Sequence, residues 1–429
     1  MTTFFAVINV LALSFMAFVI WKKDDSSVRS FFWPALTLKL AAGICVGLVY
    51  TLYYESGDTI SYFQNGILLA DLARDNILSY AKFLWSGNAT TVIVAPLAEL
   101  QPRALFMVKI VSIVNLISHD NYWISSLYLS FVCFLAAWML VKEIITINAT
   151  IRNVALVGFL FFPSVVFWSS GLLKESLAMA SLFFLAYGVL RRWKRKPLSP
   201  WQWMLIPVAL WLLWRLKYYY LAVFFPVGFA FLLTDLVLAG RPGVRSYVYL
   251  LIWSSAFIVP LLILSHVTPN FYPSRFLEVV HTSYKEFHAA SSVDDLIFYE
   301  SFQPTIVSVL EHAPKALFSG LFRKLPWEVS TFPQLLSSLE NIILLLLSLA
   351  AVTGIPRLFR SGHKLLLFSL ALYCISLCLF LSLSTPNFGT LSRYRIGFLP
   401  FFFLLIGIEN PLLRWVTSKI QRYVDHLVP

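Results

Sequence analysis

The sequence predicts an all-α, polytopic transmembrane helix bundle, and three observations support this prediction. Of the 429 residues, 59% are hydrophobic and only 13% are charged, whereas a soluble domain carries about a quarter charged residues. The chain contains about 11 mostly apolar stretches, each near the roughly 20 residues that a helix needs to cross a bilayer. Short loops rich in Lys and Arg separate many of these stretches, as the positive-inside rule expects of cytoplasmic loops.

The predicted spans follow one another along the whole chain. We interpret the first stretch as a retained span, because it lacks a basic segment before it and a small-residue cleavage site after it. The predicted spans are 4–22, 34–53, 121–142, 153–168, 172–190, 201–216, 219–239, 246–266, 337–357, 364–384 and 396–413.

The basic loops predict the orientation of the chain. Placing loops such as "WKKDDSSVRS", "RRWKRKP" and "PRLFRSGHK" in the cytoplasm gives an external N-terminus and a cytoplasmic C-terminus. The tail 414–429 then reads as a basic amphipathic helix on the inner surface. We find no internal repeat and no low-complexity linker, so residues 1–429 are predicted to form a single membrane domain.

Two long external loops interrupt the series of spans, at 55–120 and 267–336. Within the first loop, the segment 103–118 is apolar enough to span, yet counting it would invert every later loop. Its charges, Arg103 and Lys109, and its short length favour a helix that lies in the membrane interface. We therefore expect interfacial helices in both external loops.

The remaining composition excludes several classes of protein. The net charge of +12 is explained by the basic loops, so no nucleic-acid partner is predicted. The cysteines Cys45, Cys133, Cys374 and Cys378 fall inside apolar stretches and predict neither a disulfide framework nor a metal site.

The polar residues of the second external loop are interpreted as surface groups. His281, His288 and His312 lack metal-ligand spacing. Asp294 and Asp295 could bind a cation but are expected to face water.

Charged residues on the predicted outer face form the candidate site. Two acids follow the second span, while basic residues occupy outer turns against the positive-inside bias. Each such cation needs an anionic partner, a protein carboxylate or a lipid headgroup. The residues concerned are Glu55, Asp58, Lys174, Glu175, Arg215, Lys217, Arg323, Lys324, Glu328, Arg393 and Arg395.

The basic residues divide into two kinds. Arg393 and Arg395 are predicted to bind phosphate, because a guanidinium presents a fixed fork of donors that matches phosphate oxygens. Lys217 and Lys324, each taken alone, are interpreted as lysines that snorkel to the phosphates of bulk lipid.

The acids have a structural and a catalytic interpretation. Glu175 is interpreted as a structural partner of Lys174. Asp58 is either a solvated cap or ion partner, or a base that deprotonates an acceptor while cations hold a phosphorylated leaving group. The cations predicted for the same membrane face favour the second interpretation of Asp58.

This layout resembles the GT-C superfamily of integral membrane glycosyltransferases, with an acid after an early span, an external loop of interfacial helices and a many-span bundle. The resemblance implies transfer of a sugar from a polyprenyl-phosphate donor on the external face. It also implies that Asp58 in "SGDTISYF" is the catalytic base. The turn "GTLSRYRIGFLPFFFLL" is similar to the Arg-rich last outer turn of O-antigen-polymerase-like proteins, which implies that Arg393 and Arg395 hold lipid-linked phosphate.

The leading hypothesis is a membrane glycosyltransferase that moves a sugar from a polyprenyl-phosphate donor to a lipid-linked or polymeric acceptor. Asp58 would be the base and Arg393 and Arg395 would bind the donor phosphate. No metal ligand set is predicted, and a divalent cation is left open as a cofactor. Arg215, Lys217 and Lys174 would assist, with Glu55, Tyr62, Glu175 and Arg323 in support.

Two other functions remain open. A polysaccharide polymerase or ligase would join polyprenyl-diphosphate-linked glycans, with the arginines dominant. A transporter of lipid-linked glycans would carry out no chemistry, although few charges fall at the middle of the spans. In each case the expected location is a bacterial inner membrane, with the external face in the periplasm.

Overall fold

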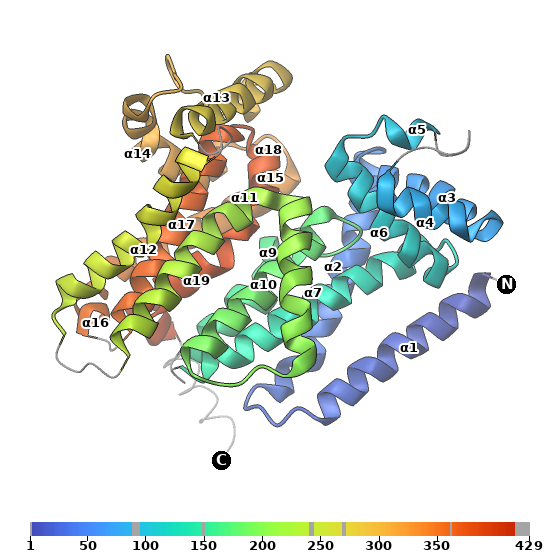
Figure 1. The fold of residues 1–429 in the computed structure, drawn as a ribbon, viewed down its shortest axis with the longest axis horizontal. Coiled ribbons are helices and arrows are strands. Elements are labelled where there is room, and N and C mark those ends of the chain that lie inside the picture. Colours follow the sequence, from blue (N-terminus) through green and yellow to red (C-terminus); the bar gives the residue numbers. More distant parts are fainter. Residues whose placement is uncertain are drawn as a thin grey trace. The chain divides into compact units, whose positions relative to one another are not determined.

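The computed structural model describes residues 2–87, 95–147, 151–239, 244–267, 272–360 and 363–416 (Figure 1). The structure is 83% helical, and the described residues form no β-strand. They contain an isolated antiparallel bridge between Leu296 and Asn387. The prediction of an all-α protein is therefore confirmed. Of the predicted tail 414–429, residues 417–429 lie outside the described residues.

Six described helices are long and apolar enough to cross a membrane. This finding supports an integral membrane protein with several spans, while the larger number of about 11 stays a prediction. Two shorter apolar helical stretches, Arg152–Phe161 and Tyr247–Ile263, accompany them. The six helical stretches are Thr3–Lys22, Arg29–Tyr53, Tyr122–Ile145, Pro200–Leu238, Phe332–Val352 and Lys364–Ser384.

The structure refines the predicted boundaries at single residues. The predicted spans 201–216 and 219–239 correspond to the two parts of α11 (Pro200–Leu238), which are separated by a kink at Lys217, where φ is −143° and ψ is 66°. The predicted span 153–168 divides into α8 (Arg152–Leu156), a π-helical turn and α9 (Pro163–Trp168). Proline lacks the N–H that would continue the preceding helix, so α9 begins anew at Pro163.

The chain divides into two compact units, each described here by itself. Unit 1 comprises Met1–Ile147, Phe159–Arg191 and Pro197–Leu221. Unit 2 comprises Asn148–Gly158, Arg192–Lys196 and Ala222–Pro429. The expectation of one membrane domain over residues 1–429 stays a prediction.

Unit 1 places α3 against α6 and α4, and these three helices lie side by side (Figure 1). The predicted helix 103–118 is confirmed as α6, while its place in the membrane interface stays a prediction. Besides α9 and the first part of α11, unit 1 contains α1 (Thr2–Lys22), α2 (Phe32–Leu48), α3 (Asp58–Asp75), α4 (Ile77–Ser86), α5 (Ala95–Ala98), α6 (Pro102–Ser118), α7 (Tyr122–Ile145) and α10 (Lys174–Trp193, to Arg191).

Helix α2 packs closely against α7 and α9 in unit 1. At Gly43 of α2, a Cβ atom would overlap the Ser130 hydroxyl of α7, so the small residue permits this approach. The Ser126 hydroxyl, also on α7, donates to the Gly43 carbonyl at 3.0 Å. The contact holds the helix that leads into the Asp58 turn.

In unit 2, α17 packs against α13, α14 and α19, and α15 packs against α14 and α19. Helices α13, α14 and α18 lie at one end of this unit, and α16 lies at the other end (Figure 1). Besides α8 and the second part of α11, unit 2 contains α12 (Ser246–Val267), α13 (Pro273–Ala290), α14 (Ile306–Phe322), α15 (Phe332–Val352), α16 (Ile355–Arg360), α17 (Lys364–Ser384), α18 (Phe388–Tyr394) and α19 (Leu399–Gly407).

Candidate functional site

Asp58 is the first residue of α3 in unit 1, and its side chain is half-buried. The preceding Gly57 has φ of +128°, and a Cβ there would lie 2.7 Å from the Tyr50 ring. Only glycine fits this turn without strain. The next residue, Thr59, is fully buried, and its hydroxyl lies 2.7 Å from the Tyr122 hydroxyl of α7. The backbone around Asp58 is therefore held on both sides.

A cation and an aromatic ring lie one helical turn from the acid. Tyr62 follows Asp58 by four residues and so shares its helix face. Tyr62 is buried, and the Lys174 ammonium lies 5.1 Å from its ring centroid, a cation–π distance. Lys174 begins α10, where the helix dipole adds positive character. Unit 1 thus places Lys174 on the ring of Tyr62, one helical turn from Asp58 along α3, and the joint role of these three residues stays a prediction.

Glu175 and Lys217 form a buried ion pair in unit 1. The Lys217 ammonium lies 2.7 Å from Glu175 Oε1, and the two side chains are 5% and 0% exposed. The prediction that Lys217 snorkels to lipid phosphate is wrong, because its ammonium is buried against Glu175 at the kink of α11. The prediction that Glu175 is a structural partner of Lys174 stays a prediction. Binding of substrate phosphate by Lys217 stays a prediction.

Lys39 is a buried cation that the sequence analysis did not select. It lies in α2 with 6% exposure, and its ammonium donates to the Ser169 carbonyl at 2.7 Å and to the Ser169 hydroxyl. These acceptors are at the C-terminal end of α9, where the helix dipole is negative. A lysine within an apolar span is the signal that could have identified it. Its bonds anchor the turn that leads to Lys174.

The other predicted residues of unit 1 lie in different surroundings. Glu55 adopts a positive φ of 55° in the exposed turn before Asp58. Arg215 lies on α11, with its guanidinium carbon 5.0 Å from the Phe106 ring centroid.

In unit 2, Arg395 is 2% exposed and is bonded to protein groups. Its Nη1 donates to Asn341 Oδ1 at 2.6 Å and its Nη2 donates to the Ser337 hydroxyl at 3.4 Å. Asn341 in turn donates to the Lys324 carbonyl at 2.8 Å. This network accounts for the buried arginine structurally, so its predicted role in phosphate binding stays a prediction.

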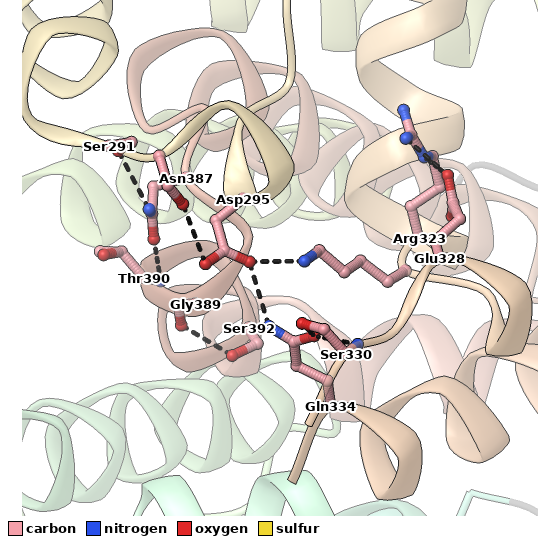
Figure 2. Close-up of polar contacts among 12 residues, drawn as sticks. Ser291, Asp295, Arg323, Glu328, Ser330, Gln334, Asn387, Gly389, Thr390 and Ser392 are labelled. Carbon is pink, nitrogen blue, oxygen red and sulfur yellow. Dashed lines mark hydrogen bonds and ion pairs between the residues drawn. The ribbon is translucent and has the colours of Figure 1, made fainter. Parts of the chain in front are cut away.

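Lys324 and Asp295 form a second ion pair in unit 2, 2.5 Å apart (Figure 2). Gln334 donates to the same carboxylate oxygen at 3.0 Å. The side chain of Lys324 is 6% exposed and that of Asp295 is 36% exposed. Two predictions about these residues are therefore wrong. Lys324 binds a protein carboxylate rather than snorkelling, and Asp295 is engaged rather than only facing water.

Arg323 binds Glu328 beside this pair at 2.6 Å (Figure 2). Burial raises the pKa of Glu328, but hydrogen bonds from Arg323 and from the Leu325 N–H outweigh it, and the pKa is lowered. The Arg323 guanidinium also lies 4.9 Å from the Phe388 ring centroid, at the start of α18. Arg393 is half-buried near the end of α18.

The predicted site residues therefore fall into two groups. Asp58, Tyr62, Lys174, Glu175, Arg215 and Lys217 belong to unit 1, and Arg323, Arg393 and Arg395 belong to unit 2. One site containing Asp58 and both arginines stays a prediction. The described residues contain no cluster of three or more His, Cys, Asp or Glu side chains that could hold a metal ion.

Comparisons with known proteins provide no relative to guide the assignment. No family model, no curated protein and no solved structure matches this chain.

Proposed function

We propose that this chain is a membrane glycosyltransferase that uses a polyprenyl-phosphate-linked sugar. The observation that carries the proposal is the position in unit 1 of a half-buried carboxylate, Asp58, one helical turn before Tyr62, whose ring lies against the Lys174 ammonium. The helical architecture and the apolar helices support a membrane location. The bacterial inner membrane, the external N-terminus and the number of about 11 spans belong to the same proposal.

In the proposed reaction, the Asp58 carboxylate takes the proton of the acceptor hydroxyl as the acceptor oxygen bonds to the anomeric carbon of the sugar. The bond from that carbon to the phosphate oxygen breaks, and the phosphate leaves with the electron pair. Lys174, at the positive end of α10, stabilises the charge that develops on the phosphate. A direct attack of this kind inverts the anomeric centre.

The test is Asp58→Asn, which keeps the size of the side chain but removes the base. We expect transfer in membranes to fall by about 100-fold or more, at a normal level of the protein. Mass spectrometry of the lipid-linked glycans should then show a repeat that lacks one sugar. The matched control is Asp71→Asn on the same helix, since Asp71 is an exposed partner of Arg74. Full transfer by Asp58→Asn would refute the proposal.

A polysaccharide polymerase or ligase is the second candidate. It is supported by the half-buried Arg393 near the end of α18, a helix whose first residue, Phe388, also contacts the basic 323–324 segment. The same glycan analysis separates the two functions. Loss of a polymerase leaves single complete repeat units, whereas loss of a transferase leaves incomplete ones.

A further inference from the structure

Three cations lie on α6 and α11 in unit 1: Arg103, Lys109 and Arg215. Each lies over an aromatic ring, and for Lys109 this is Phe83 of α4, whose centroid is 5.5 Å from the ammonium. The Arg103 guanidinium carbon lies 4.5 Å from the Tyr218 ring centroid, and that of Arg215 lies 5.0 Å from the Phe106 ring centroid. A ring that covers one face of a guanidinium leaves the N–H groups in its plane able to bind an anion.

Aromatic contacts also join the two helices at this place. Phe106 packs edge-to-face on Trp211 at 4.9 Å between ring centroids. Phe106 follows Arg103 by three residues along α6 and precedes Lys109 by three, so its ring is a neighbour of both cations on the helix surface. The cations are thus held on a packed surface rather than on a loop.

This cluster has no carboxylate partner within the described residues. The ion pairs of these parts of the chain include none formed by Arg103, Lys109 or Arg215. Burial lowers the pKa of Lys109, and the nearby positive charge of Arg215 lowers it further. The Lys109 ammonium has three N–H donors. One of them donates to the Leu84 carbonyl at 2.9 Å, so two remain for a ligand. The cluster therefore carries an excess of positive charge.

Two further features favour an anion at this place. Arg215 is exposed and lies two residues before the kink of α11 at Lys217, where its guanidinium can meet an anionic headgroup. The α6 N-terminus, next to Arg103, has no side-chain cap from Gln101 and no acid in its first turn, so its positive dipole end adds to the charge of the cluster. An anion bound here would supply the negative charge that the described residues do not provide.

We propose that Arg103, Lys109 and Arg215 bind the phosphate group of a membrane lipid. Guanidinium forks match phosphate oxygens, and the exposed Trp211 and Trp214 beside Arg215 suit an attached apolar chain. The phosphate belongs either to a phospholipid headgroup or to an isoprenoid phosphate. The site includes neither Asp58 nor Lys174. This proposal is therefore independent of the proposed sugar transfer.

The experiment measures lipid binding to the full chain in phosphatidylcholine nanodiscs by native mass spectrometry. The probes are dioleoyl phosphatidic acid, a polyprenyl monophosphate, their uncharged counterparts dioleoylglycerol and polyprenol, and inorganic phosphate. We expect one or both lipid phosphates to bind, and each to bind at least tenfold more tightly in the wild type than in Arg103→Gln/Arg215→Gln. Whichever lipid binds identifies the source of the phosphate.

The control is Arg29→Gln, which removes an arginine that stacks on Trp21 at 4.3 Å elsewhere in unit 1 and should leave binding unchanged. Asp58→Asn should also keep binding, which separates this inference from the proposed reaction. Equal binding of the uncharged lipids, equal binding of inorganic phosphate, or undiminished binding by the double variant would overturn the proposal.

Discussion

Arg395 in unit 2 and Arg215 in unit 1 lie in opposite surroundings. In unit 2, Arg395 is buried and donates to Asn341 and Ser337, and Glu340 supplies negative charge nearby. In unit 1, Arg215 is exposed and rests on Phe106 without an ion partner among the described residues. A cation whose donors are used within the protein stabilises the fold, whereas one without a counter-charge is available to a ligand. The comparison therefore separates structural from binding cations.

The largest effect is expected at the buried pair of unit 1. Glu175→Gln keeps the side chain's size but removes the charge opposite Lys217, so the free energy of unfolding should fall by about 3–5 kcal/mol. Thermal unfolding in detergent measures this change. Glu175→Gln/Lys217→Met should recover much of the loss, because it removes the buried charge as well. The exposed pair Asp71–Arg74 is the control, since Asp71→Asn should cost less than about 1 kcal/mol.

The comparison of the two arginines predicts the next effect. Arg395→Gln should lower the free energy of unfolding by about 2–3 kcal/mol, because it removes charge-assisted hydrogen bonds to Asn341 and Ser337. Arg215→Gln should change it by less than about 0.5 kcal/mol. Chemical unfolding of both variants tests this directly. If Arg215→Gln were the more destabilised variant, the division into structural and binding cations would be wrong.

Asp24, between α1 and α2, is a buried carboxylate of unit 1 whose negative charge is stabilised by hydrogen bonds. Burial raises its pKa, but hydrogen bonds from Ser26, Trp138 and Lys142 outweigh burial and lower the pKa to about 2. A lowered pKa stabilises the fold above the unfolded value of 3.8 and loses this effect as the pH falls towards 2. The loss should be about 2 kcal/mol across that interval.

Unfolding followed from pH 5 to pH 2 measures the Asp24 contribution. Asp24→Asn should be less stable than the wild type at pH 5 and should lack this part of the pH dependence. If the free energy of unfolding changed equally with pH in the wild type and in the variant, Asp24 would not titrate as the structure implies.

Much of the fold followed from the sequence, and the departures occur at particular residues. The all-α class and the helix at 103–118 are confirmed, because both depend on runs of apolar residues along one segment. The gap predicted between the spans 201–216 and 219–239 coincides with the kink at Lys217 in α11. Pro163, which the sequence predicts inside a span, instead begins α9. This error concerns a boundary, where a few local bonds decide the outcome.

The candidate site was predictable only in part. Asp58 and Lys174 were selected as charges next to apolar spans, and the structure brings both close to Tyr62. Lys39 was overlooked, because its acceptor Ser169 lies 130 residues away in the sequence. Asn341 was also overlooked, since nothing local marks it as the acceptor of Arg395.

The sequence by itself determined that this chain is helical and suited to a membrane, since apolar content and helix propensity are properties of each segment. Only the tertiary structure decided which charges are paired. Glu175 binds Lys217, and Lys324 binds Asp295. Electrostatic attraction and hydrogen bonding depend on the distance between atoms in space, and packing sets that distance among segments far apart in the chain.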